Sequence, residues 1–214
     1  MFLYWLKIII VYKLSHAAIV STSAGRVSDI VITSREVVIN YMIEEALVSP
    51  DAKSQKLALK PQDIKSAAFI RETTAALFET AIYLEAESFS ETAVSEAVVE
   101  SKAQDVIRKL KTNKDWKKLE VANREIKNIL RRKLRAKDFI RFKIDSVAIT
   151  ITDQEAQDYF DNNRLKFENL NFSNFKENIK SYLTKQQADK RLKDWFELLQ
   201  SKYRVHNFLA ERSY

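Results

Sequence analysis

Residues 129–167 read ILRRKLRAKDFIRFKIDSVAITITDQEAQDYFDNNRLKF, and they contain the signals that decide the fold. The first part continues a helix that starts at Trp116, and apolar side chains three and four residues apart carry it to about Phe142. Residues 146–151, SVAITI, are rich in β-branched side chains and predict an extended connector. Thr152 and Glu155 then have the spacing of a capping box, which predicts the start of a second, shorter helix.

The rest of the chain also favours helices, because residues that form tight turns are scarce. Among 214 residues there are one glycine, Gly25, and two prolines, Pro50 and Pro61. Sheets joined by tight hairpins need such residues at their turns. With 46% hydrophobic residues the chain can still build a core. We therefore expect a mainly all-α fold, with residues 18–214 forming a single domain.

Both ends of this domain predict short strands. Residues 18–32 contain two extended pieces around the only glycine, so we expect a hairpin that turns near Ala24 and Gly25. Residues 204–210, RVHNFLA, predict a closing strand. Because isolated strands are unstable, the closing strand is expected to pair with the hairpin.

The helices between the two ends are predicted from start signals and apolar stripes. Capping-box spacing recurs at residues 33–36 and 88–91, Pro61 suits the first turn of a helix, and Asn113 suits an N-cap. The last helix is expected to reach Tyr203. The predicted inward-facing stripes are Ile39, Met42, Ile43 and Ala46; Ile70, Thr74, Leu77, Ala81 and Leu84; Val99, Ala103, Val106 and Leu110; Leu119, Ala122, Ile126 and Ile129; and Leu192, Trp195, Phe196, Leu199 and Tyr203.

Residues 1–17, MFLYWLKIIIVYKLSHA, are apolar and aromatic but are interrupted by Lys7 and Lys13. A membrane-spanning helix needs about 20 mostly apolar residues. Ser15, His16 and Ala17 fit a small-x-small cleavage site, so a secretory signal cleaved before Ala18 is expected, with a periplasmic mature protein. An uncleaved anchor and a cytoplasmic start remain as alternatives.

Several classes of functional site are excluded by composition. The chain has no cysteine and only two histidines, His16 and His206. This composition excludes a thiolate zinc site, a cysteine nucleophile and a multi-histidine metal site. One glycine cannot form a glycine-rich phosphate loop. We expect no catalytic residue, no metal, no cofactor and no enzymatic activity, and a structural role for His206.

Taken in order, three segments resemble the SurA-like and PpiD-like family of periplasmic chaperones. They are residues 26–37, RVSDIVITSREV; residues 129–167, quoted above; and residues 188–208, ADKRLKDWFELLQSKYRVHNF. The resemblance covers about residues 26–210. It implies a helical cradle with a small β element at the termini, which in that family binds unfolded outer-membrane proteins. The cradle is also similar to the chaperone region of trigger factor.

The chain departs from the isomerase-bearing members of that family at one place. In those members a parvulin domain follows the short helix that here ends near Phe167. In this sequence only ENLNF, residues 168–172, precedes the last helix. Prolyl isomerisation by a parvulin domain is therefore not expected.

Candidate residues for binding unfolded polypeptide lie mostly in the decisive stretch. Phe139, Phe142 and Ile144 alternate with Arg141 and Lys143, so they cannot all face one core. We expect them to form a client-binding wall, because exposed apolar surface rimmed by charge suits unfolded chains. The alternative is that the phenylalanines pack under the last helix. Tyr159 joins the candidates, because it adjoins Phe160 and one of the two rings is expected to be exposed.

The charges are divided unevenly along the chain. Residues 26–100 contain 7 basic and 13 acidic residues, whereas residues 101–143 contain 16 basic and 5 acidic residues. The densest basic run is Arg131, Arg132, Lys133, Arg135 and Lys137. A nucleic-acid interface is one interpretation, but no known nucleic-acid motif accompanies the run. Two other interpretations remain: the basic helix is solvated or packed against the acidic helices, or its charge attracts acidic clients or anionic lipid.

The sequence therefore predicts an ATP-independent periplasmic holdase that binds unfolded or nascent envelope proteins. Two other functions remain open: an assembly module for one specific envelope partner and, less favoured, a basic nucleic-acid-binding protein. A strand-swapped homodimer through the terminal β elements and a peripheral association with a membrane are also left open.

Overall fold

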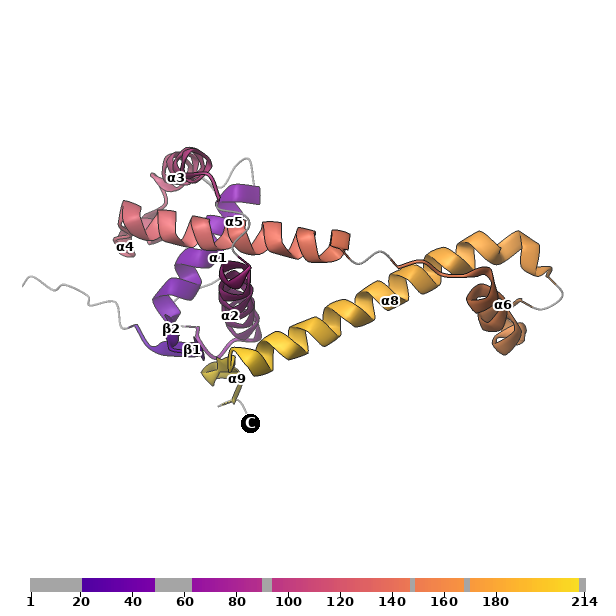
Figure 1. Cartoon of the computed structure of the whole chain (residues 1–214). Helices are drawn as coiled ribbons and strands as arrows, with labels where there is room; N and C mark the ends of the chain where they lie inside the picture. Colours follow the sequence, from indigo (N-terminus) through magenta and orange to yellow (C-terminus); the bar gives the residue numbers. More distant parts are fainter. Residues whose placement is uncertain (1–20, 49–62, 90–93, 147–148, 168–169, 212–214) are drawn as a thin grey trace, which may run out of the picture.

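The computed structural model describes residues 21–48, 63–89, 94–146, 149–167 and 170–211. These residues form a helical body and a long arm (Figure 1). The elements are β1 Ser23–Val27, β2 Ile30–Thr33, α1 Ser34–Val48, α2 Ala67–Ser88, α3 Glu96–Leu110, α4 Lys114–Lys118, α5 Asn123–Ser146, α6 Asp153–Asn162, α7 Arg164–Phe167, α8 Phe172–Lys202, β3 His206–Asn207 and α9 Phe208–Glu211. The predicted fold class, mainly all-α with a small β element, is confirmed.

The arm consists mainly of α8, and α6 lies at its far end (Figure 1). With 31 residues, α8 is about 46 Å long at 1.5 Å per residue. Its C-terminal part packs on α2 in the body, and its N-terminal part packs on α6. The arm therefore carries a small distal lobe, made of α6, α7 and the start of α8, away from the body.

The sheet ties the two ends of the described chain together. Its strand order is β2-β1-β3, and β1 pairs antiparallel with both neighbours. Gly25 is opposite Asn207, and Arg26 is opposite His206. The prediction that the closing strand pairs with the N-terminal hairpin is confirmed, and the pairing is within one chain.

Two details of the predicted β element are wrong. The hairpin turns at Ser28 and Asp29, where Ser28 has a positive φ of 50° and its amide donates to the Tyr203 carbonyl at 2.6 Å. Gly25 lies inside β1. The closing strand is only two residues long, because the Asn207 side chain accepts hydrogen bonds from the amides of Leu209 and Ala210 and so caps α9.

Three of the predicted helix starts are confirmed by their hydrogen bonds. At α1 the Glu36 amide donates to the Thr33 hydroxyl at 3.2 Å. Asn113 caps α4 by accepting from two backbone amides. Thr152 forms a complete capping box with Glu155 at the start of α6. Each of these signals is local, which explains why sequence alone could identify it.

The capping box predicted at residues 88–91 is wrong. Ser88 is the last residue of α2, and its hydroxyl donates to the Glu85 carbonyl at 2.6 Å. The next helix, α3, begins after Ser95. Residues 90–93 lie outside the described residues, as do Pro61 and the predicted signal in residues 1–17; the described helix α2 starts after the N-cap Ser66.

The predicted helix from Trp116 to Phe142 is two helices. Glu120 has a positive φ of 49° and separates α4 from α5. Ala122 lies in this break and is exposed, although a buried position was predicted. The helix also runs further than expected, since α5 continues to Ser146.

Three apolar clusters hold the described residues together. The main cluster fills the body, and it buries every member of the predicted stripes in α1 and α3. A second cluster joins α2, α5 and the end of α8 around Leu199. A third cluster belongs to the distal lobe and buries Phe160 and Ile179. None of the described helices is both long and apolar enough to cross a bilayer.

Candidate functional site

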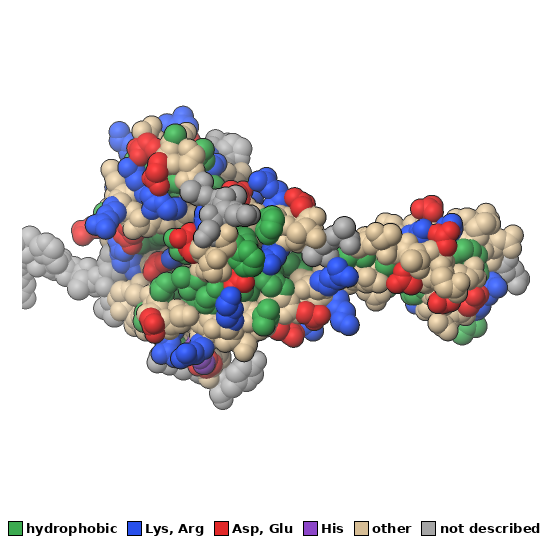
Figure 2. All heavy atoms as spheres, viewed as in Figure 1, with side chains coloured by type: hydrophobic (Ala, Val, Ile, Leu, Met, Phe, Trp, Pro, Cys, Tyr) green, Lys and Arg blue, Asp and Glu red, His purple; other side chains and the backbone are tan. Residues whose placement is uncertain are grey.

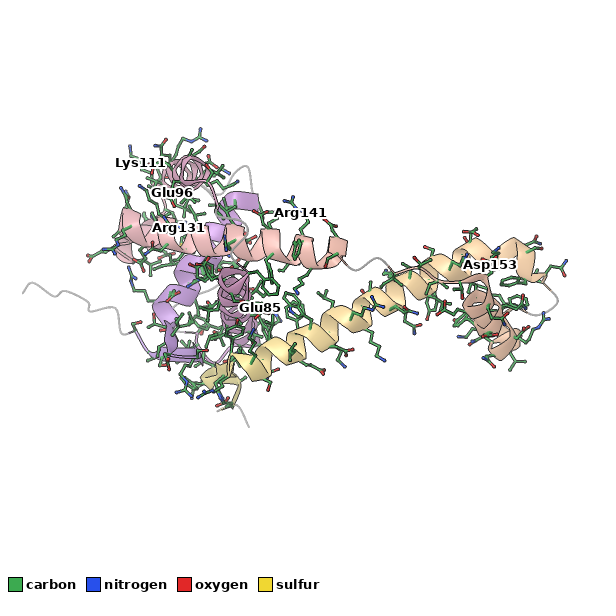
Figure 3. The ribbon with its side chains drawn as sticks, viewed as in Figure 1. Glu85, Glu96, Lys111, Arg131, Arg141 and Asp153 are labelled. Atoms are coloured by element: carbon green, nitrogen blue, oxygen red, sulfur yellow. The ribbon has the colours of Figure 1, made fainter. Side chains whose placement is uncertain are left out.

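The basic run of α5 is paired with acidic side chains of the other body helices. Arg132 lies 2.8 Å from Glu36 and 3.3 Å from Glu79, and Lys133 lies 2.8 Å from Glu79. Further pairs join α5 to carboxylates of α1, α2 and α3: Lys133 with Glu44, Arg135 with Glu87, Arg131 with Glu96 and Lys127 with Glu100. Figure 3 shows Arg131 and Glu96 on neighbouring helices.

These pairs confirm the interpretation that acidic helices pack against the basic one. The side chains of Arg132 and Lys133 are only 14% and 10% exposed. A nucleic-acid interface needs cations that reach phosphates from the surface. Arg132 and Lys133, at the centre of the basic run, therefore pair with carboxylates of the body and are not available to phosphates.

An aromatic surface lies where α2, α5 and α8 meet. We define it by Phe89 after α2, Phe139 and Phe142 of α5, and Trp195 of α8. The ring centroid of Phe139 is 5.3 Å from that of Phe89, 6.0 Å from that of Phe142 and 6.1 Å from that of Trp195. Four rings from three helices therefore form one continuous contact, with Phe139 at its centre.

The rings differ in how much solvent they meet. Phe139 is 5% exposed, whereas Phe89 is 46% and Phe142 is 50% exposed. Trp195 is half-buried and contacts the Phe196 ring beside it. Phe139 is therefore buried beneath the more exposed rings of Phe89 and Phe142. Figure 2 shows hydrophobic side chains gathered on the visible face of the body, over the region where α2, α5 and α8 converge.

A cation lies over the aromatic surface. The Lys143 ammonium is 4.8 Å from the centroid of the Phe89 ring and 5.4 Å from that of the Phe139 ring. Cation–π contacts of this length are attractive and leave the remaining ammonium protons for other acceptors. The surface therefore presents an apolar face and a positive charge side by side.

A buried carboxylate holds the end of α8 next to this surface. Glu85 is 8% exposed and accepts hydrogen bonds from the Lys202 ammonium at 2.6 Å and the Tyr203 hydroxyl at 2.7 Å. Burial alone would raise the pKa of Glu85, but the hydrogen bonds from Lys202 and Tyr203 outweigh it, and the pKa lies below the ordinary glutamate value. Figure 3 places Glu85 where α2 approaches α8. These hydrogen bonds thus join α2 to the C-terminal end of α8, close to Phe89 and Trp195.

The structure brings together only part of the predicted client-binding set. Phe139 packs against Trp195 of the last helix, as the alternative interpretation expected, while Phe142 on the same surface is half-exposed. Ile144 is 53% exposed near the end of α5. Tyr159 lies in the distal lobe, where it contacts Phe167 and Tyr182, and so is separate from the aromatic surface. Its neighbour Phe160 is 1% exposed.

Sequence reasoning missed two members of the aromatic surface. Phe89 was assigned to a helix start and Trp195 to the core. The adjacent aromatic pair Trp195 and Phe196 was a usable signal, because two neighbouring positions on a helix cannot both face the centre of one core. Nothing in the sequence near Phe89 indicated that this ring would meet α5.

No metal site accompanies this surface. The described residues contain no group of three or more histidine, cysteine, aspartate or glutamate side chains that could hold an ion. His206 lies in β3, and its ring is 3.2 Å from the Glu211 carboxylate.

Known proteins offer no guide to this site. No family model, curated protein or solved structure matches the chain. The rings, charges and exposures of its own side chains therefore carry the functional inference.

Proposed function

We propose that this protein is a periplasmic, ATP-independent holdase that binds unfolded or nascent envelope proteins at the aromatic surface. The observation that carries the proposal is the half-exposed pair Phe89 and Phe142 around the buried ring of Phe139. Exposed aromatic rings that contact one another offer apolar area to a client, and such patches are often functional. The resemblance of three sequence segments to the SurA-like family supports the same function.

The size of the surface fits reversible binding. A phenylalanine buries about 150–250 Å² when fully covered, so covering the exposed halves of Phe89 and Phe142 removes on the order of 200 Å² of apolar area from water. At about 25 cal/mol per Å² this contributes about 5 kcal/mol before entropic costs. After those costs, such a contact alone binds no more tightly than about millimolar. A client would be held by repeated weak contacts and released without nucleotide.

The charges beside the rings suit clients of mixed character. Unfolded chains expose apolar side chains together with carbonyl and carboxylate oxygens. Lys143 stands over Phe89 and Phe139 and can donate to such oxygens while an apolar client group covers the rings. The aromatic surface therefore needs no defined client sequence.

The link between α7 and α8 supports a function without isomerase activity. α7 ends at Phe167, and α8 begins at Phe172. Four intervening residues leave no room for a parvulin domain at the position where the isomerase-bearing members of the SurA-like family carry one. We propose that the protein holds clients and does not isomerise their prolyl bonds.

Aggregation of an unfolded outer-membrane protein, followed by light scattering, tests the proposal. The wild-type chain in several-fold molar excess is expected to suppress aggregation without ATP. The double variant Phe89→Ser/Phe142→Ser removes the exposed rings and is expected to lose most of this effect. The matched control is Val98→Ser/Leu165→Ser, since those side chains are 44% and 97% exposed on α3 and α7.

The outcomes separate the alternatives. Equal loss in both double variants would show that exposed apolar residues in general, and not the aromatic surface, suppress aggregation. No suppression by the wild-type chain, together with affinity capture of one stoichiometric envelope protein, would replace the holdase by an assembly module. A mature N-terminus at Ala18 in a periplasmic extract would establish the proposed compartment.

A further inference from the structure

One end of the body carries cations that, unlike those in the centre of α5, form no ion pair with the residues that the structure describes. Lys111 follows α3, Lys114 and Lys117 lie in α4, and Arg124 lies in the first turn of α5. All four are exposed, and none makes an ion pair within the described ranges of the chain. We call these four residues the basic end.

The local sequence does not neutralise the basic end. Residues 111–124 contain five basic residues, the four above and Lys118, and two acidic residues, Asp115 and Glu120. Asp115 is already bonded to Lys118 at 3.0 Å. A net charge of +3 over 14 residues therefore remains on a short, exposed part of the fold. Figure 2 shows Lys and Arg side chains gathered at the end of the body opposite the arm, and Figure 3 labels Lys111 there.

The described chain starts beside the basic end. The Thr22 carbonyl accepts from the Ser34 amide at 2.8 Å, and the next residue, Arg35, donates to the Leu119 carbonyl at 2.6 Å and bonds Glu125 at 2.6 Å. Through Ser34 and its neighbour Arg35, Thr22 is thus linked to the junction of α4 and α5.

The arm leaves the body on the other side. In Figure 1, α4 lies at one extreme of the molecule and α6 at the opposite one. A flat partner that covers the basic end would therefore leave the aromatic surface and the distal lobe in water. This arrangement allows one large planar partner and one extended client to bind at the same time.

We propose that the basic end docks on the surface of an anionic lipid bilayer. Each lysine or arginine near such a surface adds a favourable contribution that decays within a Debye length, so several unpaired cations on one end act together. The four cations come from three elements at one end of the body and accompany no known nucleic-acid motif, which favours a planar anionic bilayer over a nucleic acid as the polyanion. The proposal is independent of the holdase function.

Vesicle co-sedimentation of the full chain tests the docking. The vesicles are phosphatidylcholine alone or phosphatidylcholine mixed with phosphatidylglycerol, at low and high salt. Wild type is expected to bind the anionic vesicles more strongly, and high salt is expected to reduce the difference. Lys111→Glu/Lys114→Glu/Lys117→Glu should weaken binding to anionic vesicles at least about tenfold.

The matched control is Lys185→Glu/Lys190→Glu/Arg191→Glu, which makes the same charge change at exposed positions of α8. It should bind within about twofold of wild type, because these residues lie on the arm. Residues 1–17 are the same in all variants, so the difference between the two triple variants isolates the basic end. Circular dichroism should show equal helix content in all three proteins.

Two results would overturn the proposal. One is equal binding of wild type and both triple variants to anionic vesicles. The other is tight, Lys111/Lys114/Lys117-dependent binding of a DNA duplex in fluorescence anisotropy with no preference for anionic vesicles, which would assign the basic end to nucleic acid.

Discussion

Gly25 in β1 lies directly against Leu77 in α2: a Cβ at Gly25 would be 2.7 Å from the Leu77 Cδ1 atom and 2.6 Å from the His206 carbonyl oxygen. The only glycine of the chain is therefore set by close packing between the sheet and α2, and not by the turn of the hairpin. Because β1 also pairs with β3, this contact sits at the junction of the two ends of the domain.

Gly25→Ala is expected to lower the free energy of unfolding by about 1–3 kcal/mol, because the added Cβ overpacks against the β3 backbone at His206 and against Leu77 of α2. Urea denaturation followed by circular dichroism measures the change. Ser23→Ala, at an exposed position of the same strand, should stay within about 0.5 kcal/mol of wild type. A Gly25→Ala variant as stable as wild type would mean that β1 and α2 are not packed this closely.

Glu85 predicts a pH dependence of stability. Its pKa is lowered in the folded protein, because the hydrogen bonds from Lys202 and Tyr203 outweigh the opposing effect of burial. A lowered folded-state pKa contributes stability above the unfolded value of about 4.3, and this stability is lost as the pH falls through the folded-state pKa. Glu85→Gln should cost about 2 kcal/mol at neutral pH, because it weakens two hydrogen bonds to a buried charged group, and it should flatten the acid limb of the stability curve.

Urea midpoints measured between neutral and acidic pH check this prediction. Glu197→Gln is the control. The Glu197 side chain is 64% exposed and lies 3.7 Å from the Lys193 ammonium. This substitution should leave the curve nearly unchanged. Identical acid limbs for wild type and Glu85→Gln would show that Glu85 is not the group that titrates.

The interhelix charge network predicts unequal effects of two conservative substitutions. Glu79 is 16% exposed and bonds both Arg132 and Lys133, so Glu79→Gln leaves two nearly buried cations short of an acceptor and should cost about 2–4 kcal/mol. Asp138→Asn removes an exposed pair with Arg141 and should cost under about 0.5 kcal/mol. Thermal or urea unfolding measures both. Similar costs would argue against the burial of the network.

The aromatic surface contains a structural ring and an exposed ring, and substitution should distinguish them. Phe139→Ala opens a cavity below the surface and should cost about 3–5 kcal/mol. Phe142→Ala removes a half-exposed ring and should cost under about 1 kcal/mol. Denaturant unfolding checks both values, and a large cost for Phe142→Ala would place this ring in the core.

The distal lobe should unfold locally. Its apolar cluster is separate from that of the body, and α8 is the helix that shares contacts with both. Phe160→Ala is therefore expected to abolish hydrogen-exchange protection of α6 and to leave that of α2 unchanged. Hydrogen exchange with mass spectrometry resolves the two helices. Equal loss of protection in α2 would mean that body and lobe unfold as one unit.

Local signals in the sequence were sufficient for much of the fold. The helix starts at Thr33, Asn113 and Thr152 depend on side chains and amides within three residues of one another, so their spacing alone identified them. The pairing of the chain ends followed from the need of isolated strands for partners. Predictions were wrong where a distant contact decided the conformation: Tyr203 accepts from the Ser28 amide at the hairpin turn, and Leu77 packs against Gly25.

The candidate site depended more on such distant contacts. The alternation of phenylalanine with basic residues indicated the α5 part of the aromatic surface. The positions of Phe89 and Trp195 follow from how α2 and α8 pack on α5, which no local spacing encodes. Tyr159 was included because it adjoins Phe160 and one of the two rings was expected to be exposed, and the long arm separates it from the aromatic surface.

Site-specific photo-crosslinking measures the central claim most directly. A photoreactive phenylalanine analogue replaces Phe142 in one variant and Leu165 in another, and each is irradiated with an unfolded outer-membrane protein. The aromatic surface predicts strong adducts from position 142 that disappear once the client has folded, and few from position 165. Equal adducts at both positions, or none at position 142, would contradict client binding at this surface.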